Sequence, residues 1–412
     1  MIELLIVLAI IAILAVVVVL TLNPAELLRQ GRDSNRVSDM STSNEAINLY
    51  NADQGGASGY SLGSPNTVYV SIPDPNATTT AGTNCSSLGL PTLPSTYTYH
   101  CAGPNYYRKV NGTGWIPVNF SNISAGSPLS NLPVDPINSS SSRLYYTYTT
   151  NGSQFEVTAA MESAKYQVGG SNDVISTDGG PLASVYEKGS QLGLEPLDYG
   201  DPTLVGWWPL TEGTGAVAYD DSGNNATGSW NGTQAGTSGY YSPGKVGQWA
   251  GTFDGSTDYV GLNKGNLPSG SNPVSEFAWI YSTAQSGQQA VVSYGTSVAP
   301  EKVGLELNGS VLRIDCYACN SDQTFTVSMN TWHFVGFVYA GGTNLIMYLD
   351  NQSSTFSDFG PLNIIFPGSD SADIGKRSNG GTNYFPGLID DVRIYNRALS
   401  AAQIAAMYAG GK

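Results

Sequence analysis

The sequence is poor in charged residues, which make up 12% of its 412 positions. Only 17 residues are basic against 32 acidic ones, so the formal net charge is −15, and no cluster of Lys and Arg is present. Because nucleic-acid binding draws most of its affinity from basic side chains that neutralise phosphates, nucleic acid is excluded as the main partner. Apolar residues still make up 41% of the chain, which is enough for it to fold.

Histidine is scarce as well, with two in the whole chain. His100 follows a Tyr-Thr-Tyr run and His333 lies in Trp-His-Phe-Val, so both are expected on strands as structural residues. This shortage argues against a Ser-His-Asp catalytic site and against a two-histidine metal site. The sequence therefore predicts a protein that is not an enzyme.

Glycine and tyrosine are abundant, with 49 and 25 residues. Turn formers and β-favouring aromatics in these numbers indicate a chain rich in strands and turns, and its length predicts two or three domains. We expect a long hydrophobic and amphipathic helix over residues 1–50, a globular β domain over 51–202 and a β-sandwich over 203–412. The predicted fold class is an α+β unit, with a long N-terminal helix and a small antiparallel sheet, followed by an all-β jelly-roll sandwich.

Residues 4–22 form an apolar run without a charge, long enough to span a bilayer as a helix. The run lacks the features of a secretory signal peptide, so we expect it to stay on the mature chain. After Pro24 the pattern becomes amphipathic, and a kink or unwound turn is expected at this proline. Glu3 precedes the run and needs a partner, because an unpaired carboxylate in a membrane is costly. Snorkelling of Glu3 to the membrane edge is the alternative.

The segment MIELLIVLAIIAILA closely resembles the mature N-terminus of type IV pilins and pseudopilins. The resemblance implies that Glu3 pairs with the N-terminal amine of a neighbouring subunit during assembly, with Pro24 as a second residue of the assembly helix. It also implies a helical homopolymer at the cell surface, assembled by pilus machinery from subunits first inserted in the inner membrane. Met1 directly precedes Ile2 where the family has Phe-Thr-Leu, so the sequence does not fix the mature start.

Residues 51–202 contain short strand-like runs between turn signals. Asn151-Gly152 favours a two-residue turn and hence a β-hairpin. A helix followed by a small antiparallel sheet is similar to the globular head of a pilin. Cys85 and Cys101 are predicted to form a disulfide, as expected of an exported protein. Asp135 and Asp178 are interpreted as turn residues rather than calcium ligands.

Residues 203–412 show many short alternating strands without a long helix between them, which is typical of a two-sheet sandwich. Motifs such as WWPLTEGTGAVAYDDSGNNATG, FDGSTDYV and FPGLIDDVRIYNRALSAAQI resemble the laminin-G-like, concanavalin-A-like lectin/glucanase superfamily. The resemblance implies binding of glycans or proteins, often with one structural calcium ion. The expected calcium ligands are Asp221, Asn224, Asp254, Asp390 and Asp391. The alternative is that these residues simply form tight turns.

Sugar binding needs exposed aromatic side chains that stack on a pyranose. The candidates in predicted loops are Trp230, Tyr240, Tyr241, Tyr317 and Tyr384. Cys316 and Cys319 have CxxC spacing, which we interpret as a local disulfide because no second ligand pair for a metal is visible. A glycosidase is disfavoured, because its paired carboxylates are missing and the glutamates are expected at strand edges and in turns. Those glutamates are Glu276, Glu301 and Glu306.

These features together predict a structural subunit of an extracellular type IV pilus-like filament that displays a lectin-like adhesion domain. Many sites on one filament would give avidity for surface glycans or proteins. The alternatives are a monomeric membrane-anchored surface lectin, a minor or tip pseudopilin and, third, a glycosidase.

Overall fold

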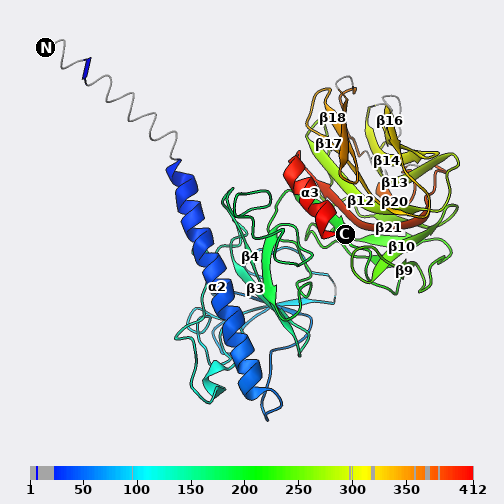
Figure 1. Ribbon diagram of the computed structural model, residues 1–412. Helices are drawn as coiled ribbons and strands as arrows, with labels where there is room; N and C mark the ends of the chain where they lie inside the picture. Colours follow the sequence, from blue (N-terminus) through cyan, green and yellow to red (C-terminus); the bar gives the residue numbers. More distant parts are fainter. Residues whose placement is uncertain are drawn as a thin grey trace. The chain divides into compact units, whose positions relative to one another are not determined.

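The computed structural model describes residues 6–7, 23–94, 96–296, 298, 300–316, 321–356, 359–366, 372–378 and 381–411 (Figure 1). The chain divides into two compact units: Met1–Leu90 with Thr98–Glu195, and Pro91–Tyr97 with Pro196–Lys412. The boundary therefore precedes the predicted position near Pro202. The residues just before Pro202 belong to the second unit because the Asp201 carboxylate pairs with the Arg397 guanidinium at 2.7 Å.

The first unit combines one long helix, α2 (Pro24–Gln54), with a five-stranded sheet in the order β2-β1-β3-β4-β5. The elements of the sheet and its connections are β1 (Thr67–Val70), β2 (Thr98–Cys101), the 3-10 helix η1 (Phe120–Asn122), β3 (Tyr146–Thr150), β4 (Phe155–Ala160) and β5 (Val185–Gly189). The pair β1–β2 is parallel, so the sheet is mixed and not wholly antiparallel as predicted. The long connection between these two strands lets the chain return in the same direction. That this α+β unit is a pilin stays a prediction.

The helix α2 begins where the sequence provides a cap. The Asn23 side chain accepts a hydrogen bond from the Glu26 N–H, and Pro24 occupies the first helical position. Asn23 itself has a φ of 39°, so the backbone is not right-handed helical at the point where a kink was expected. Farther along, Met40 and Ile47 are buried against the sheet. Within the part of the chain that the structure describes, no helix is long and apolar enough to cross a membrane.

The second unit is a β-sandwich. Its strands are β6 (Leu204–Trp208), β7 (Val217–Ala218), β8 (Gly228–Asn231), β9 (Tyr241–Pro243), β10 (Trp249–Asp254), β11 (Tyr259–Leu262), β12 (Val274–Ser282), β13 (Gln288–Gly295), β14 (Lys302–Asn308), β15 (Val311–Asp315), β16 (Ser321–Thr326), β17 (Trp332–Tyr339), β18 (Leu345–Leu349), β19 (Gln352–Phe356), β20 (Ala372–Ile374) and β21 (Pro386–Tyr395). Sheet I has the order β19-β18-β17-β12-β21-β10-β9, with β6 also paired to β21. Sheet II has the order β16-β15-β14-β13-β20-β11-β8-β7. The predicted two-sheet sandwich is confirmed.

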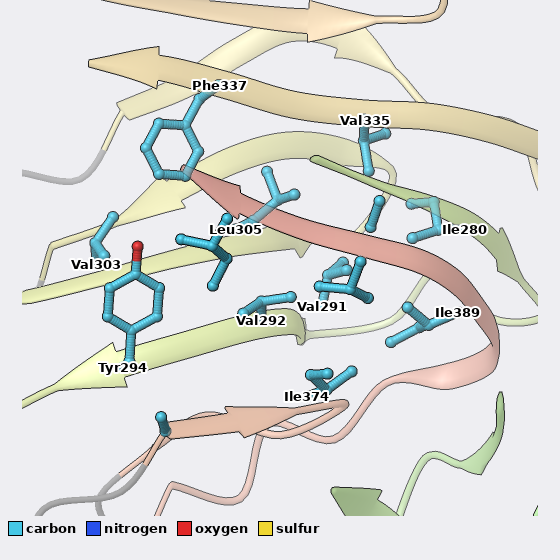
Figure 2. Packing of buried hydrophobic residues seen from close by; sticks show 14 of the residues in the cluster. Ile280, Val291, Val292, Tyr294, Val303, Leu305, Val335, Phe337, Ile374 and Ile389 are labelled. Carbon is cyan, nitrogen blue, oxygen red and sulfur yellow. The ribbon is translucent and has the colours of Figure 1, made fainter. Parts of the chain in front are cut away.

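The sandwich interior is filled by alternate side chains of both sheets, as Figure 2 shows for Ile280 and Val335 of sheet I and Val292 and Leu305 of sheet II. Each such side chain contributes roughly 1.5–3 kcal/mol when fully buried. The alternation also decides which residues point away from the interior, and so positions the polar side chains of sheet II. A terminal helix, α3 (Ala401–Gly410), follows the sandwich and begins at the predicted cap, Ser400.

Candidate binding face of the sandwich

Five charged side chains lie together on the outer face of sheet II, and we call Lys302, Glu306, Arg313, Asp315 and Arg377 the charged cluster. The first two belong to β14 and the next two to its neighbour β15, whose intervening residues fill the interior. The register of the two strands places Glu306 opposite Arg313. Arg377 follows β20 and reaches the same place from a loop. Strand alternation therefore gathers the cluster on one face.

Ion pairs connect the cluster. The Asp315 Oδ2 atom lies 2.8 Å from Arg377 Nη2 and 3.4 Å from Lys302 Nζ. Glu306 Oε1 lies 3.8 Å from Arg377 Nε. The side chains of Lys302, Glu306 and Asp315 are fully buried, whereas that of Arg377 is 21% exposed. Arg377 is thus the member of these pairs that an external ligand reaches most directly.

The buried location changes the acidity of this cluster. Burial raises the pKa of the Glu306 carboxyl, and the nearby Asp315 charge adds to the increase. Burial lowers the pKa of the Lys302 ammonium. Neither oxygen of Glu306 accepts a hydrogen bond from any residue that the structure describes. Perturbed, partly satisfied groups of this kind are found at functional sites and in structural ion networks.

Two of the three glutamates do not lie where the sequence predicted. Glu276 and Glu306 lie inside strands β12 and β14, not at edges or in turns, and both are fully buried. Burial raises the pKa of Glu276 well above its usual range, next to Tyr294. Glu301 precedes β14, outside any strand. A charged residue within an apolar strand resembles a strand end in the sequence, which explains the wrong prediction for Glu276 and Glu306.

Two half-buried tyrosines contact Lys376, the residue that precedes Arg377 of the cluster. Tyr259 on β11 and Tyr384 before β21 have ring centroids 6.3 Å apart in an edge-to-face arrangement. The Lys376 ammonium lies 4.0 Å from the Tyr259 ring centroid, within the range of a cation–π interaction. Lys376 and Tyr384 form an isolated antiparallel bridge, which brings these two residues side by side. Arg377 directly follows Lys376, so adjacent residues of this loop contact the tyrosine pair and the charged cluster.

Of the predicted sugar-binding aromatics that the structure describes, Tyr384 alone lies at this face. Trp230, Tyr240 and Tyr241 are buried in the sandwich interior, so their prediction as exposed loop residues is wrong. Trp230 stacks on Tyr240 at 4.7 Å and donates through Nε1 to the Tyr241 hydroxyl at 2.9 Å. Trp230 lies within β8 and Tyr241 is the first residue of β9, so these short strands carry both rings inward, and Tyr240 lies in the turn just before β9. Tyr317 lies outside the described residues.

The predicted calcium ligands on β10 and β21 contact groups of the protein itself. Asp254 Oδ1 accepts the backbone N–H groups of Ser256, Thr257 and Asp258 in a tight turn, at 2.9, 2.7 and 2.8 Å. Although burial opposes them, these hydrogen bonds hold the pKa of Asp254 well below its usual range. Asp390 Oδ2 accepts the Lys245 and Val246 N–H groups at 2.7 and 2.8 Å.

The remaining predicted ligands are also engaged. Asp391 Oδ1 accepts from Trp207 Nε1 at 2.7 Å and from an arginine on the same strand. Asn224 donates to the Leu204 carbonyl at 2.8 Å, and the Asp221 backbone bonds to Trp207. Among the described residues, no group of three or more His, Cys, Asp or Glu is arranged to hold a metal ion. The contacts do not assemble one oxygen cage, so the calcium site stays a prediction and no step below uses it.

The cysteines and the assembly glutamate complete the predicted sites. A disulfide joins Cys85 to Cys101, the pairing predicted from the sequence. Cys316 is buried and disulfide-bonded, whereas Cys319 lies outside the described residues. Glu3 lies outside them as well. The charged cluster was missed because its members come from β14, β15 and a distant loop, and only the paired register brings them together.

Comparison with known proteins identifies the domain type of much of the second unit. Residues 254–405 match the family model of the concanavalin A-like lectin/glucanases superfamily, so this region is a lectin-like β-sandwich domain. No curated protein matches the sequence.

Several solved structures are similar to part of this chain at low identity. Domain 4 of AbnA, a GH43 extracellular arabinanase from Geobacillus stearothermophilus, in complex with arabinotriose, is 18% identical, and the match covers 50% of this chain and 98% of that one with a TM-score of 0.40. The binding domain of botulinum neurotoxin DC in complex with rat synaptotagmin II is 12% identical, with 51% and 52% coverage and a TM-score of 0.40. The receptor-binding domain of botulinum neurotoxin D is 16% identical, with 50% and 52% coverage and a TM-score of 0.36. The matches span about half the length of the toxin domains.

Proposed function

We propose that this protein is a subunit of an extracellular type IV pilus-like filament and displays a lectin-like domain that binds surface glycans. The match to the lectin/glucanase family over residues 254–405 supports the adhesive part. The observation that carries the filament part is the exposed apolar start of α2. The resemblance of the preceding residues to pilins supports the same assignment.

The first turns of α2 present apolar side chains to solvent. Leu27 and Leu28 are 54% and 65% exposed, whereas Met40 and Ile47 farther along the helix are completely buried. In Figure 1 these first turns extend past the sheet that covers the rest of α2. The two leucines follow the apolar run of residues 4–22 after an interval of four residues, so the exposed pair lies close to that run in sequence. Such a surface calls for an apolar partner, and the same helix of a neighbouring subunit supplies one.

The outer face of sheet II is the proposed glycan-binding face. Half-buried aromatic rings, here Tyr259 and Tyr384, suit the apolar face of a sugar ring. Next to them, Arg377 offers planar donors to hydroxyl or carboxylate oxygens. Such a combination of apolar surface and a few oriented polar groups is what small-ligand sites use. On a filament, many copies of a weak site give strong attachment to a surface.

Substitution of Leu28 tests the filament assignment. Leu28→Asp places a charge in the proposed helix bundle and is expected to abolish filaments while the protein remains in the membrane fraction. Leu49→Asp is the matched control, because Leu49 is also exposed on α2, at 45%, but lies near the opposite end of the helix. Its filaments should persist. Equal filament yield from both variants would contradict the assignment and favour a monomeric, membrane-anchored lectin.

Glycan binding is tested separately with the full chain on immobilised oligosaccharides. Tyr384→Ala should weaken binding. Thr382→Ala, which changes an exposed residue of the same loop without removing an aromatic ring, should not weaken it. Binding that survives Tyr384→Ala unchanged would place the ligand elsewhere on the sandwich.

A further inference from the structure

Three side chains at one end of the sandwich form a continuous hydrogen-bonded chain. Ser328 Oγ lies 2.7 Å from His333 Nε2, and His333 Nδ1 lies 2.9 Å from Asp350 Oδ2. Nε2 thus faces the hydroxyl and Nδ1 faces the carboxylate, as in the Ser-His-Asp triads of serine hydrolases. Both histidines lie on strands as expected, and a Ser-His-Asp arrangement is present despite the scarcity of histidine.

The three residues come from different segments that meet at a crossover between the sheets. Ser328 lies in the connection from β16 of sheet II to β17 of sheet I, and His333 is the second residue of β17. Asp350 lies in the turn between β18 and β19. Because β18 pairs with β17, the hairpin turn returns to the start of β17, where the histidine is. No local sequence motif indicates that these three residues come together, so their arrangement could not be predicted from the sequence.

Asp350 is held in place by two further hydrogen bonds, one from its backbone and one to its carboxylate. The Asp350 N–H donates to the Phe334 carbonyl at 2.7 Å, and Asp350 Oδ1 accepts from the Phe334 N–H at 2.9 Å. The backbone φ of 54° lies in the left-handed region, which aspartate adopts in turns more readily than most residues. These contacts orient Oδ2 toward the imidazole. A fixed carboxylate selects the tautomer in which Nε2 accepts the serine proton.

The exposure of the three groups suits a nucleophile and a sheltered base. Ser328 is exposed, whereas the side chains of His333 and Asp350 are only 13% and 27% exposed. The backbone N–H groups of Ser328 and Met329 donate no hydrogen bond to any part of the chain that the structure describes. Backbone donors at and just after a nucleophile are the groups that serine hydrolases direct at an oxyanion.

We propose that Ser328 and His333 are catalytic residues that hydrolyse small carboxylic esters, with Asp350 as the residue that positions the imidazole. An exposed nucleophile suits an acyl group that protrudes from a larger molecule, such as an ester on a sugar hydroxyl. Only this choice of a sugar ester rests on the proposed glycan binding. The ester chemistry itself rests on the triad geometry.

The reaction balances without a cofactor. Ser328 Oγ attacks the ester carbonyl carbon while His333 Nε2 takes the hydroxyl proton, and the backbone N–H groups stabilise the oxyanion. Collapse of the intermediate breaks the bond to the alkoxy oxygen, which leaves as an alcohol with the proton from His333. Water then attacks the acyl-serine and gives a proton to His333, which returns it to Ser328 Oγ as the carboxylic acid departs. One ester and one water yield one alcohol and one acid.

The test is hydrolysis of p-nitrophenyl acetate by the full-length protein, combined with fluorophosphonate labelling and peptide mapping. We expect turnover above the buffer rate and an adduct on Ser328. Ser328→Ala and His333→Gln should each reduce turnover by about 100-fold or more, to background, and Asp350→Asn should also reduce it strongly. Ser286→Ala is the matched control, an exposed serine in the same sandwich, and should retain full activity.

Two results would overturn the proposal: equal turnover by the wild-type protein and Ser328→Ala, or fluorophosphonate labelling that does not include Ser328. Ser328 is exposed, so its alanine variant is expected to keep the wild-type melting temperature, and a thermal melt checks this. The ester probe carries no sugar. A failure of glycan binding therefore leaves this measurement unaffected, and the two proposals are judged separately.

Discussion

Arg36 shows how a single buried residue holds the first unit together. Its guanidinium is fully buried and bonds Asp135 through Nε at 2.6 Å, and Asp33 and Glu162 through Nη1 at 2.6 and 2.8 Å. Burial opposes ionisation, but these bonds dominate and raise the pKa of Arg36, so it stays charged. The network joins α2 to the loops that carry Asp135 and Glu162.

Substitution of Arg36 should be strongly destabilising. Arg36→Ala leaves buried carboxylates without their cation, which typically costs about 3–5 kcal/mol of unfolding free energy. Arg29→Ala is the control on the same helix, because its side chain is 51% exposed and its pairing with Glu26 is loose at 3.7 Å. Exposed pairs contribute roughly 0–1 kcal/mol. Denaturant unfolding of both variants provides the measurement, and similar losses would contradict the account.

Local roles of residues were predictable from the sequence, and distant partners were not. Asp135 is the turn residue that the sequence indicated, since its Oδ1 accepts the Ile137 N–H at 2.7 Å. The same carboxylate also binds Arg36, which is 99 positions away. Turn chemistry depends on the next two or three residues, so one sequence reveals it. A salt bridge across the fold depends on packing that no local pattern encodes.

At the scale of elements, the β3–β4 hairpin was predicted with its turn displaced by one residue. Thr150 pairs with Phe155, and the Asn151 N–H bonds to the Gln154 carbonyl at 3.2 Å. Gly152, with a φ of 92°, therefore occupies the first central position instead of the second. A glycine there also satisfies the twist of a hairpin, so the Asn-Gly signal located the turn but not its register. The parallel pairing of β1 with β2 could not be predicted, because no periodic pattern in the sequence indicates which strands pair.

The face of the five-stranded sheet opposite α2 carries a buried carboxyl pair. Glu156 on β4 and Glu187 on β5 are both fully buried, and one oxygen of each accepts no hydrogen bond from a donor in the described residues. Burial, reinforced by the hydrogen bond and charge of Glu156, raises the pKa of Glu187. Burial raises the pKa of Glu156 as well. The two groups are therefore stable together only while a proton is shared between them.

This pair predicts a stability that declines with pH. Above the ordinary glutamate pKa, near 4.5, the unfolded chain releases a proton that the folded chain retains, so the free energy of unfolding falls as pH rises. Glu187→Gln replaces the shared proton with a permanent amide donor. We expect this variant to melt higher than the wild type at pH 8, with a smaller difference at pH 5.

The matched control for the carboxyl pair is Glu45→Gln, an exposed glutamate on α2. It should change the melting temperature little, and by the same amount at both pH values. If Glu187→Gln were destabilising at pH 8, or if its effect did not depend on pH, the shared proton would be the wrong explanation.

For the whole molecule, the sequence predicted the sandwich fold of the second unit but not the location of its candidate sites. The alternating strands predicted the sandwich because burial of one face imposes period two on each strand. The charged cluster and the Ser328–His333–Asp350 chain depend on strand order and on crossovers, which that period does not contain. The burial of Trp230 was not predicted either, because a loop and a short strand have similar sequence patterns.

The central claim is that this chain forms filaments that display the sandwich, and imaging tests it most directly. Material sheared from producing cells should be examined by electron microscopy with helical reconstruction. The account predicts a filament whose core is a bundle of the N-terminal helices and whose every subunit carries the lectin-like sandwich. Filaments without density for the sandwich, with this protein found entirely in the membrane fraction, would contradict it.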